Sequence, residues 1–271
     1  MSAGKNTTFY QALHCNKKGV CQIDSIELIG EEPLMIRVED KPYSVVMRTP
    51  GEEVFHAAGI CLGEGIVDSP DDFKTIGHDI NLDPNIVDIW LTPERKKKIP
   101  DLLKRKSYIS QTSCGICGKQ LIKDLHQVLI PAEDGFKVDI EGIFNCVKML
   151  SKKQNYYPRT RGSHAALLFD DQLEILTFAE DVGRHNALDK AIGKAFMDRT
   201  LSKASLLVLS SRISYELVQK AARAHLPMII SKSRPTALAV QMGQSLNMTL
   251  ACAFEGSKLL VLCGEDRIIK K

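Results

Sequence analysis

Two cysteines separated by two residues, Cys114 and Cys117, are the side chains whose type and spacing most directly indicate chemistry in this sequence. A glycine follows each of them, and the approach at 108–113 is polar. The reactive form of cysteine is the thiolate, which a helix N-terminus stabilises, and a helical pattern at 119–129 follows the pair. Glycine neighbours leave both sulfurs open to a large partner. The motif therefore predicts sulfur chemistry on an accessible loop.

Three kinds of sulfur site use a C-x-x-C motif. A structural zinc site needs four ligands, but the other six cysteines form no second such pair and no closely spaced histidine pair follows, so we expect no structural metal. A thioredoxin-like disulfide follows the first strand of a βαβ unit, whereas about a hundred residues precede this pair. A loop carrying a nucleophilic or sulfur-carrying thiol agrees best with the polar, glycine-rich flanks.

The composition is that of an ordinary globular protein. The 271 residues are 44% hydrophobic and 25% charged, which allows one large or two modest domains. A net charge of +3 is too small to indicate a nucleic-acid partner, and the basic runs at 95–98 and 104–106 are typical of a solvated surface or linker. A flank that attracts phosphate to the cysteine loop is the alternative for these runs.

Neither a membrane span nor an apolar signal core is visible in the sequence. We therefore expect no membrane association and a cytoplasmic location, where thiols stay reduced. The cysteines outside the C-x-x-C motif are then expected to be buried apolar residues and not a disulfide framework.

The two parts of the chain differ in the predicted order of strands and helices. A β-rich first part contains a predicted hairpin at 34–38 and 43–47, a helix at 53–62 and a strand at 86–91. The basic, proline-bounded stretch at 92–106 is predicted to be a boundary or linker. The second part alternates strands with helices, which favours βαβ units and a partly parallel sheet. Its predicted strands are at 164–169, 173–178, 205–210, 228–231, 248–253 and 258–262, and its predicted helices are at 185–197, 213–224 and 235–246.

Three predicted strand-to-helix turns carry polar and basic residues. Ligands of open α/β sheets bind outside the carboxyl ends of the strands, near helix N-termini. Simple helix capping explains any one such turn, but three turns with an arginine each predict a crevice for a phosphorylated or nucleotide-like ligand. The candidate contacts are Asp181, Arg184 and His185 in the first turn, Ser210 and Arg212 in the second, and Ser231 and Arg234 in the third.

The common nucleotide-binding motifs and the zinc-deaminase pattern do not occur in the sequence. Neither a G-x-G-x-x-G nor a P-loop motif is present, and the order and spacing of the histidines and cysteines do not match a zinc deaminase. His164 begins a strand and is interpreted as structural, whereas His185 at a helix start is expected to be a neutral hydrogen-bonding imidazole that contacts a ligand.

Six motifs, in order and spread over most of the chain, carry a family resemblance. They are RTPG at 48–51, GEGI at 63–66, SCGICGK at 113–119, EDVGRHNALDKAIG at 180–193, SSRISYELVQKAARA at 210–224 and SRPTALAV at 233–240. On these motifs the chain resembles the formate dehydrogenase accessory sulfurtransferase (FdhD/NarQ) family.

The resemblance implies a sulfurtransferase with a cysteine persulfide intermediate. Such a protein accepts sulfur from a cysteine desulfurase and transfers it to the molybdenum bis(molybdopterin guanine dinucleotide) cofactor of formate dehydrogenase. Cys114 would carry the persulfide, and Cys117 would have a less uniform role. The implied fold is α/β: a small β-rich α+β domain at 1–107 and a cytidine-deaminase-like α/β domain without the zinc site at 108–271. The protein would be a homodimer.

The family resemblance also implies a loop that contacts the cofactor. Its residues are Phe254, Glu255, Gly256, Ser257, Lys258 and Leu259. The chain departs from the family pattern here, because the arginine that members often carry is missing, and at Arg161, where a glycine is usual. The cysteine loop and the three turns match the family.

Two other functions would use the same residues. A chaperone for the cofactor and formate dehydrogenase would need the crevice but no thiol. A thiol-disulfide oxidoreductase would need the C-x-x-C pair but no persulfide. Loss of function on replacing Cys114 separates the sulfur carrier from the chaperone.

Overall fold

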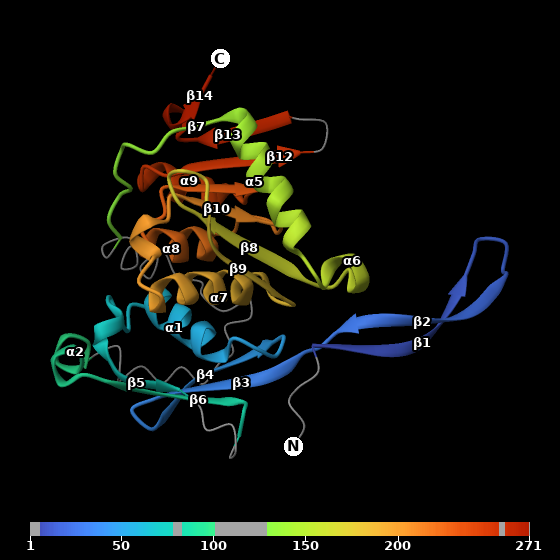
Figure 1. Ribbon diagram of the computed structural model, residues 1–271, viewed down its shortest axis with the longest axis horizontal. Helices are drawn as coiled ribbons and strands as arrows, with labels where there is room; N and C mark the ends of the chain where they lie inside the picture. Colours follow the sequence, from blue (N-terminus) through green and yellow to red (C-terminus); the bar gives the residue numbers. More distant parts are fainter. Residues whose placement is uncertain (1–5, 78–82, 101–128, 255–257, 271) are drawn as a thin grey trace.

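The computed structural model describes residues 6–77, 83–100, 129–254 and 258–270. Within these ranges the chain is a mixed α/β fold with a four-stranded sheet, a six-stranded sheet and two two-stranded pairings. Helices lie between the two larger sheets, and a further helix covers the other face of the six-stranded sheet (Figure 1). No helix in the described ranges has the length and apolar character needed to cross a membrane.

The first two strands form an arm, residues 7–29, which projects from the body of the molecule (Figure 1). Strands β1 (Thr7–Cys15) and β2 (Cys21–Ile29) pair antiparallel along their full length. At the base, the amide of Asn6 donates to the Tyr156 hydroxyl at 2.7 Å, and Arg159 lies 3.0 Å from the Glu27 carboxylate. This hairpin was not predicted from the sequence.

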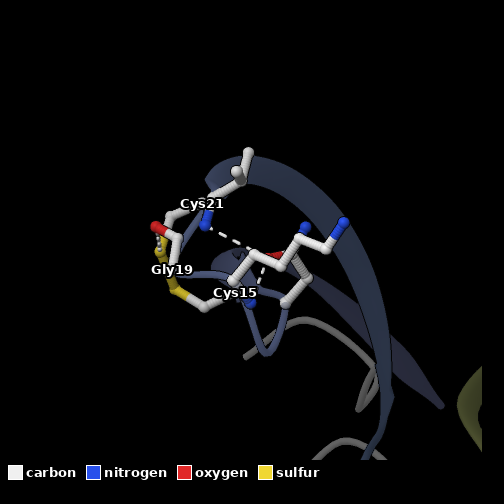
Figure 2. The surroundings of a disulfide bond; sticks show 6 residues. Cys15, Gly19 and Cys21 are labelled. Atoms are coloured by element: carbon white, nitrogen blue, oxygen red, sulfur yellow. Dashed lines mark hydrogen bonds between the residues drawn. A yellow bond between two sulfur atoms is a disulfide. The ribbon is translucent and has the colours of Figure 1, made fainter.

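A disulfide between Cys15 and Cys21 joins the two strands at the tip of the arm (Figure 2). The expectation that the cysteines outside the C-x-x-C motif are buried is wrong for this pair, because the antiparallel register places the two exposed residues opposite each other. The expectation is confirmed for the buried Cys61, Cys146 and Cys252.

The four-stranded sheet follows the arm and has the order β4-β3-β6-β5. Its strands are β3 (Glu32–Val38), β4 (Lys41–Arg48), β5 (Phe73–Gly77) and β6 (Ile86–Leu91), with α1 (Glu53–Gly63), a 3-10 turn (Pro70–Asp72) and α2 (Pro93–Lys98) between or after them. The predicted hairpin, helix and strand are all confirmed. Glu39 and Asp40 both have positive φ, as a tight hairpin turn requires, and Leu34, Ile36 and Val38 alternate toward the interior.

The six-stranded sheet has the order β13-β12-β11-β10-β8-β9. Its strands are β8 (His164–Phe169), β9 (Ile175–Asp181), β10 (Leu206–Leu209), β11 (Met228–Ser231), β12 (Thr249–Phe254) and β13 (Lys258–Cys263). The helices that follow β9, β10 and β11 are α7 (Arg184–Met197), α8 (Tyr215–Arg223) and α9 (Ala237–Ser245). Every strand and helix predicted for this part is present, and β10, β11 and β12 are parallel as expected.

Helix α5 (Ile140–Lys153) covers the opposite face of this sheet and was not predicted. Its buried side chains Ile143, Cys146 and Leu150 are spaced at helical intervals and contact a core formed by the sheet. The remaining elements are the pairing of β7 (Val138–Asp139) with β14 (Ile268–Ile269), the short helix α6 (Tyr157–Thr160) and 3-10 turns at Leu201–Lys203 and Glu265–Arg267.

Helices α1 and α7 cross in close contact between the two larger sheets (Figure 1). Glycine permits the approach: a Cβ atom at Gly59 would overlap the carbonyl oxygen of Asp189, and one at Gly193 would overlap the carbonyl oxygen of Phe55. One apolar core spans both sheets and this helix pair. The expected domain division at residue 107 lies outside the described residues, and the cytidine-deaminase-like character of the second part stays a prediction.

The basic run at 95–98 belongs to α2 and is not a linker. Lys97 and Lys98 are exposed, as a solvated surface predicts, but Arg95 is only 4% exposed. The Arg95 guanidinium donates to the carbonyl oxygens of Ile66 and Gly65, both at 2.7 Å, and pairs with Asp68. The surface interpretation fails for Arg95 alone, because its side chain faces inward and satisfies two carbonyl groups that follow α1.

Candidate functional site

The three predicted turns lie at one edge of the six-stranded sheet. Strands β10, β11 and β12 are parallel, so their carboxyl ends share an edge. Strand β8 is antiparallel to β10, and β9 is antiparallel to β8, so β9 also ends there. The turns that follow β9, β10 and β11 are therefore neighbours, together with the end of β12, and we call this the site edge. This gathering was the central structural prediction from the sequence.

Asp181 ends β9 and is fully buried. Its carboxylate accepts hydrogen bonds from the backbone N–H of Thr49 at 3.1 Å and of Gly183 at 2.9 Å, and from the Asn186 amide at 2.9 Å. The ammonium group of Lys190 lies 2.7 Å away. These partners occupy the carboxylate oxygens, so Asp181 connects the RTPG segment to the start of α7 and is engaged within the protein.

His185 reaches from the first turn to the N-terminus of α8. Its Nε2 atom lies 3.1 Å from a carboxylate oxygen of Glu216 and 3.5 Å from the hydroxyl of Ser214. The hydrogen bond with His185 is the largest influence on Glu216 and lowers the pKa of its carboxyl. Ser214 and Glu216 were not singled out from the sequence, although an acidic residue in the first turn of a predicted helix was a visible signal.

Arg184 stands half-buried at the first position of α7. Its Nε atom is buried and makes no hydrogen bond with the part of the chain that the structure describes. Burial lowers the pKa of the nearby His164, and the Arg184 guanidinium lowers it further. A buried N–H without an acceptor and an imidazole kept neutral beside a cation describe a place where an anion would be stabilised.

Ser210 and Ser231 connect the turns to one another. The Ser210 hydroxyl accepts from the backbone N–H of Ala165 at 2.8 Å. The Ser231 hydroxyl donates to the carbonyl oxygen of Ser211 at 2.5 Å and accepts from the N–H of Ser233 at 2.9 Å. Both serines therefore hold backbone in place, but neither caps a helix, which was the alternative to ligand binding; the residues at the N-caps of α8 and α9 are Ser214 and Thr236.

Arg212 and Arg234 are the exposed arginines of the site edge, and the third turn adds the exposed Lys232. The Arg212 guanidinium makes no hydrogen bond or ion pair with described residues, and Arg234 lies over the Phe254 ring at 5.9 Å from its centroid. Arg234 thus brings the third turn against the predicted cofactor loop. Lys258 adds an exposed cation on the far side of that loop. Arginine presents several N–H groups in a plane, which suits phosphate oxygens.

Several predicted site residues lie outside the described ranges. They are Cys114, Cys117, Glu255, Gly256 and Ser257. Leu259 is described and pairs with Ala253 across β12 and β13.

Comparison with known proteins identifies the family. A family model described as the FdhD/NarQ family matches residues 29–269. A protein named "Sulfur carrier protein FdhD" from Streptomyces coelicolor is 35% identical over 251 residues, covering 89% of this chain and 88% of that protein. A protein of the same name from Mycobacterium tuberculosis is 36% identical over 253 residues, covering 89% and 91%.

A solved structure shares the fold. The crystal structure of a formate dehydrogenase accessory protein from Desulfotalea psychrophila superposes with a TM-score of 0.78, covering 98% of this chain and all of that one. At 19% identity this likeness shows the fold alone. The match over residues 29–269 and the identity to the curated relatives are together sufficient: this chain belongs to the FdhD/NarQ family.

Proposed function

We propose that this protein is a sulfur carrier that accepts persulfide sulfur from a cysteine desulfurase and passes it to the molybdenum bis(molybdopterin guanine dinucleotide) cofactor required by formate dehydrogenase. The names of the curated relatives and of the structural neighbour support this class of function. The proposal includes a cytoplasmic homodimer with Cys114 as the sulfur-bearing residue and Cys117 assisting it.

The observation that carries the proposal is the arrangement of arginines at the site edge. Arg184, Arg212 and Arg234 follow three different strands that end at the same edge of the sheet. The cofactor is the cargo of the reaction. Its dinucleotide phosphates are anions that would fit these cations and the Nε of Arg184, which has no partner among the residues that the structure describes.

The sulfur steps use ordinary persulfide exchange. The Cys114 thiolate attacks the outer sulfur of the desulfurase persulfide, the sulfur–sulfur bond of that persulfide breaks, and the desulfurase cysteine leaves as a thiolate. Cys114 then bears the sulfur that is delivered to the cofactor. The cofactor would be held through its phosphates, while Ser210, Ser231 and Asp181 keep the backbone of the site edge in place.

Mass spectrometry after incubation with a cysteine desulfurase and cysteine is the direct test. We expect one added sulfur on Cys114 and none in Cys114→Ala. In cells that lack the native accessory protein, Cys114→Ala should abolish formate dehydrogenase activity and Cys117→Ala should reduce it. The buried Cys61→Ala, Cys146→Ala and Cys252→Ala variants are matched controls and should restore activity nearly fully. Full activity with Cys114→Ala would favour the chaperone, and disulfide turnover without persulfide would favour the oxidoreductase.

Calorimetry with GDP tests the site edge separately. We expect binding that weakens as salt is added and that weakens by roughly tenfold or more in Arg212→Ala, because a charged hydrogen bond to phosphate is lost. Lys203→Ala is the matched control, since this exposed lysine precedes β10 and therefore lies at the opposite edge. GDP binding that is absent from the wild type, or unchanged in Arg212→Ala, would place the cofactor elsewhere.

A further inference from the structure

The tip of the arm carries an exposed sulfur pair that the proposed function does not use. Cys15 and Cys21 are directly opposite in the register of β1 and β2, and both are exposed (Figure 2). The match to the family model begins at residue 29, the last residue of the arm. We propose that this pair is a thiol-disulfide exchange site whose substrates are thiols.

Access distinguishes this pair from the other described cysteines. A thiolate reacts with a disulfide only if it can approach one sulfur along the sulfur–sulfur bond, and exposed disulfides are the ones that exchange readily. The arm projects into solvent, and the tip side chains around the bond are exposed (Figure 1). Cys61, Cys146, Cys252 and Cys263 are buried, so no reagent reaches them in the folded protein.

The turn between the two cysteines is held by hydrogen bonds that do not involve sulfur. The Asn16 side-chain oxygen accepts from the backbone N–H of Lys18 at 2.9 Å and of Val20 at 3.1 Å. The backbone N–H of Asn16 donates to Val20 at 3.0 Å, and Gly19 supplies the positive φ of 78° that the turn needs. These contacts can persist after reduction, so the two thiols remain opposite each other and can form the bond again.

The surroundings also suit the charges of the reaction. Lys17 and Lys18 lie in the turn between the two cysteines, are exposed and attract an anionic thiolate. The Sγ atom of Cys21 lies 3.7 Å from the carbonyl oxygen of Gly19, which can accept the S–H group once the bond is reduced (Figure 2).

The exchange balances without any other reactant. An incoming thiolate attacks one sulfur, the bond between Cys15 and Cys21 breaks, and a mixed disulfide forms. A second substrate thiolate then attacks the substrate sulfur of the mixed disulfide, and the protein cysteine leaves as a thiolate. Two substrate thiols become one disulfide, and their two protons end on Cys15 and Cys21. The reverse reaction with a disulfide restores the bond.

The test is equilibration of the full chain in glutathione buffers of graded reduced-to-oxidised ratio, followed by alkylation and mass spectrometry. We expect alkyl groups to appear on Cys15 and Cys21 together and reversibly, with the same midpoint from either starting state. A second measurement replaces glutathione by thioredoxin, its reductase and NADPH, and it identifies which kind of thiol is the substrate. If thioredoxin reduces the disulfide faster than glutathione does, the substrate is a dithiol protein. If the two rates of reduction are equal, the substrates are small thiols.

Two variants make the test sharper. Asn16→Ala should slow re-formation of the disulfide by roughly fivefold or more, because two hydrogen bonds of the turn are lost, while the matched change Gln11→Ala in the middle of β1 should not. Cys114→Ala should exchange normally, so failure of the sulfur-carrier function leaves this proposal unaffected. A bond that stays oxidised at large excess of reduced thiol in the folded protein, or a pair that stays reduced in oxidised buffer, would overturn the proposal.

Discussion

The ammonium group of Lys190 lies 2.7 Å from the carboxylate of Asp181, and both side chains are almost completely buried. Lys190 also donates to the carbonyl oxygen of Thr49 at 2.7 Å. The pair joins the RTPG segment, which precedes α1, to the strand and helix that form the first turn of the site edge. The ion pair thus connects the two larger sheets by an electrostatic contact. The packing of α1 against α7 connects them as well.

Replacing Asp181 by Ala should destabilise the protein by about 3–5 kcal/mol, because Lys190 would be left as an uncompensated buried charge. Urea unfolding measures the loss. The matched control is Asp71→Asn, which breaks a fully exposed ion pair with Arg199 and should leave the unfolding midpoint almost unchanged. A small effect of Asp181→Ala would mean that water reaches Lys190.

Replacing Gly59 by Ala should cost at least about 3 kcal/mol or prevent folding, since the new methyl group would meet backbone and not a movable side chain. Soluble yield and thermal unfolding report the effect. Gly77→Ala, where a Cβ atom meets nothing within 4 Å, should change stability by less than about 0.5 kcal/mol. Equal behaviour of the two variants would contradict the close crossing of α1 and α7.

Arg95→Ala should cost about 3 kcal/mol, because two carbonyl groups at the end of α1 lose their buried donor. Lys97→Ala, an exposed position in the same basic run, should cost less than about 0.5 kcal/mol. The comparison is made by urea unfolding of the two variants. If both changes were equally mild, the run would be the surface feature that its charge suggests.

His56 should make stability fall in mildly acidic solution. Burial, and then the neighbouring Lys190 and Lys220, hold the pKa of His56 well below its ordinary value of 6.5. The unfolded chain binds a proton there below about pH 6.5 and the folded chain does not, so stability decreases as pH falls, by up to about 1.4 kcal/mol per pH unit. His56→Gln should reduce this slope between about pH 6.5 and pH 5, provided its unfolding stays cooperative. An unchanged slope would show that His56 is protonated in the folded state.

Native alkylation at mildly basic pH should leave four cysteines unmodified. Burial raises the pKa of the Cys146 thiol to about 12 and that of Cys252 to about 11, and Cys61 and Cys263 shift in the same direction. Iodoacetamide should label these residues only after unfolding in urea, as peptide mass spectrometry can measure. Rapid labelling of Cys252, which lies beside the third turn, would indicate that the site edge opens.

The second half of the fold could be predicted because its strands and helices alternate regularly. Strand β11 matches the predicted 228–231, and the ends of the helices after β9, β10 and β11 differ from the prediction by at most two residues. The arm could not be predicted, because its apolar residues lie on both faces and no core selects one face. Leu13 and Ile23 are 64% and 70% exposed.

The sequence was sufficient to predict that the site lies at one edge of the sheet, but it was not sufficient to predict the individual side-chain contacts. The alternation of strands and helices indicated a partly parallel sheet, in which the turns after the strands share one edge. Whether Ser231 faces a ligand or a carbonyl group depends on side-chain direction, which a motif does not contain. For the same reason the sequence did not indicate that Glu216 meets His185, since 31 residues separate them.

The backbone-to-backbone crossing of α1 and α7 affects how the molecule can move. Side chains between packed helices normally absorb small shifts by changing rotamer. At Gly59 and Gly193 the two backbones are in direct contact, so no side chain lies between them to do this. A displacement of α7, whose first turn lies at the site edge, must therefore carry α1 and its sheet along as one stiff unit. A displacement that begins at Arg184 would therefore reach the four-stranded sheet through α1.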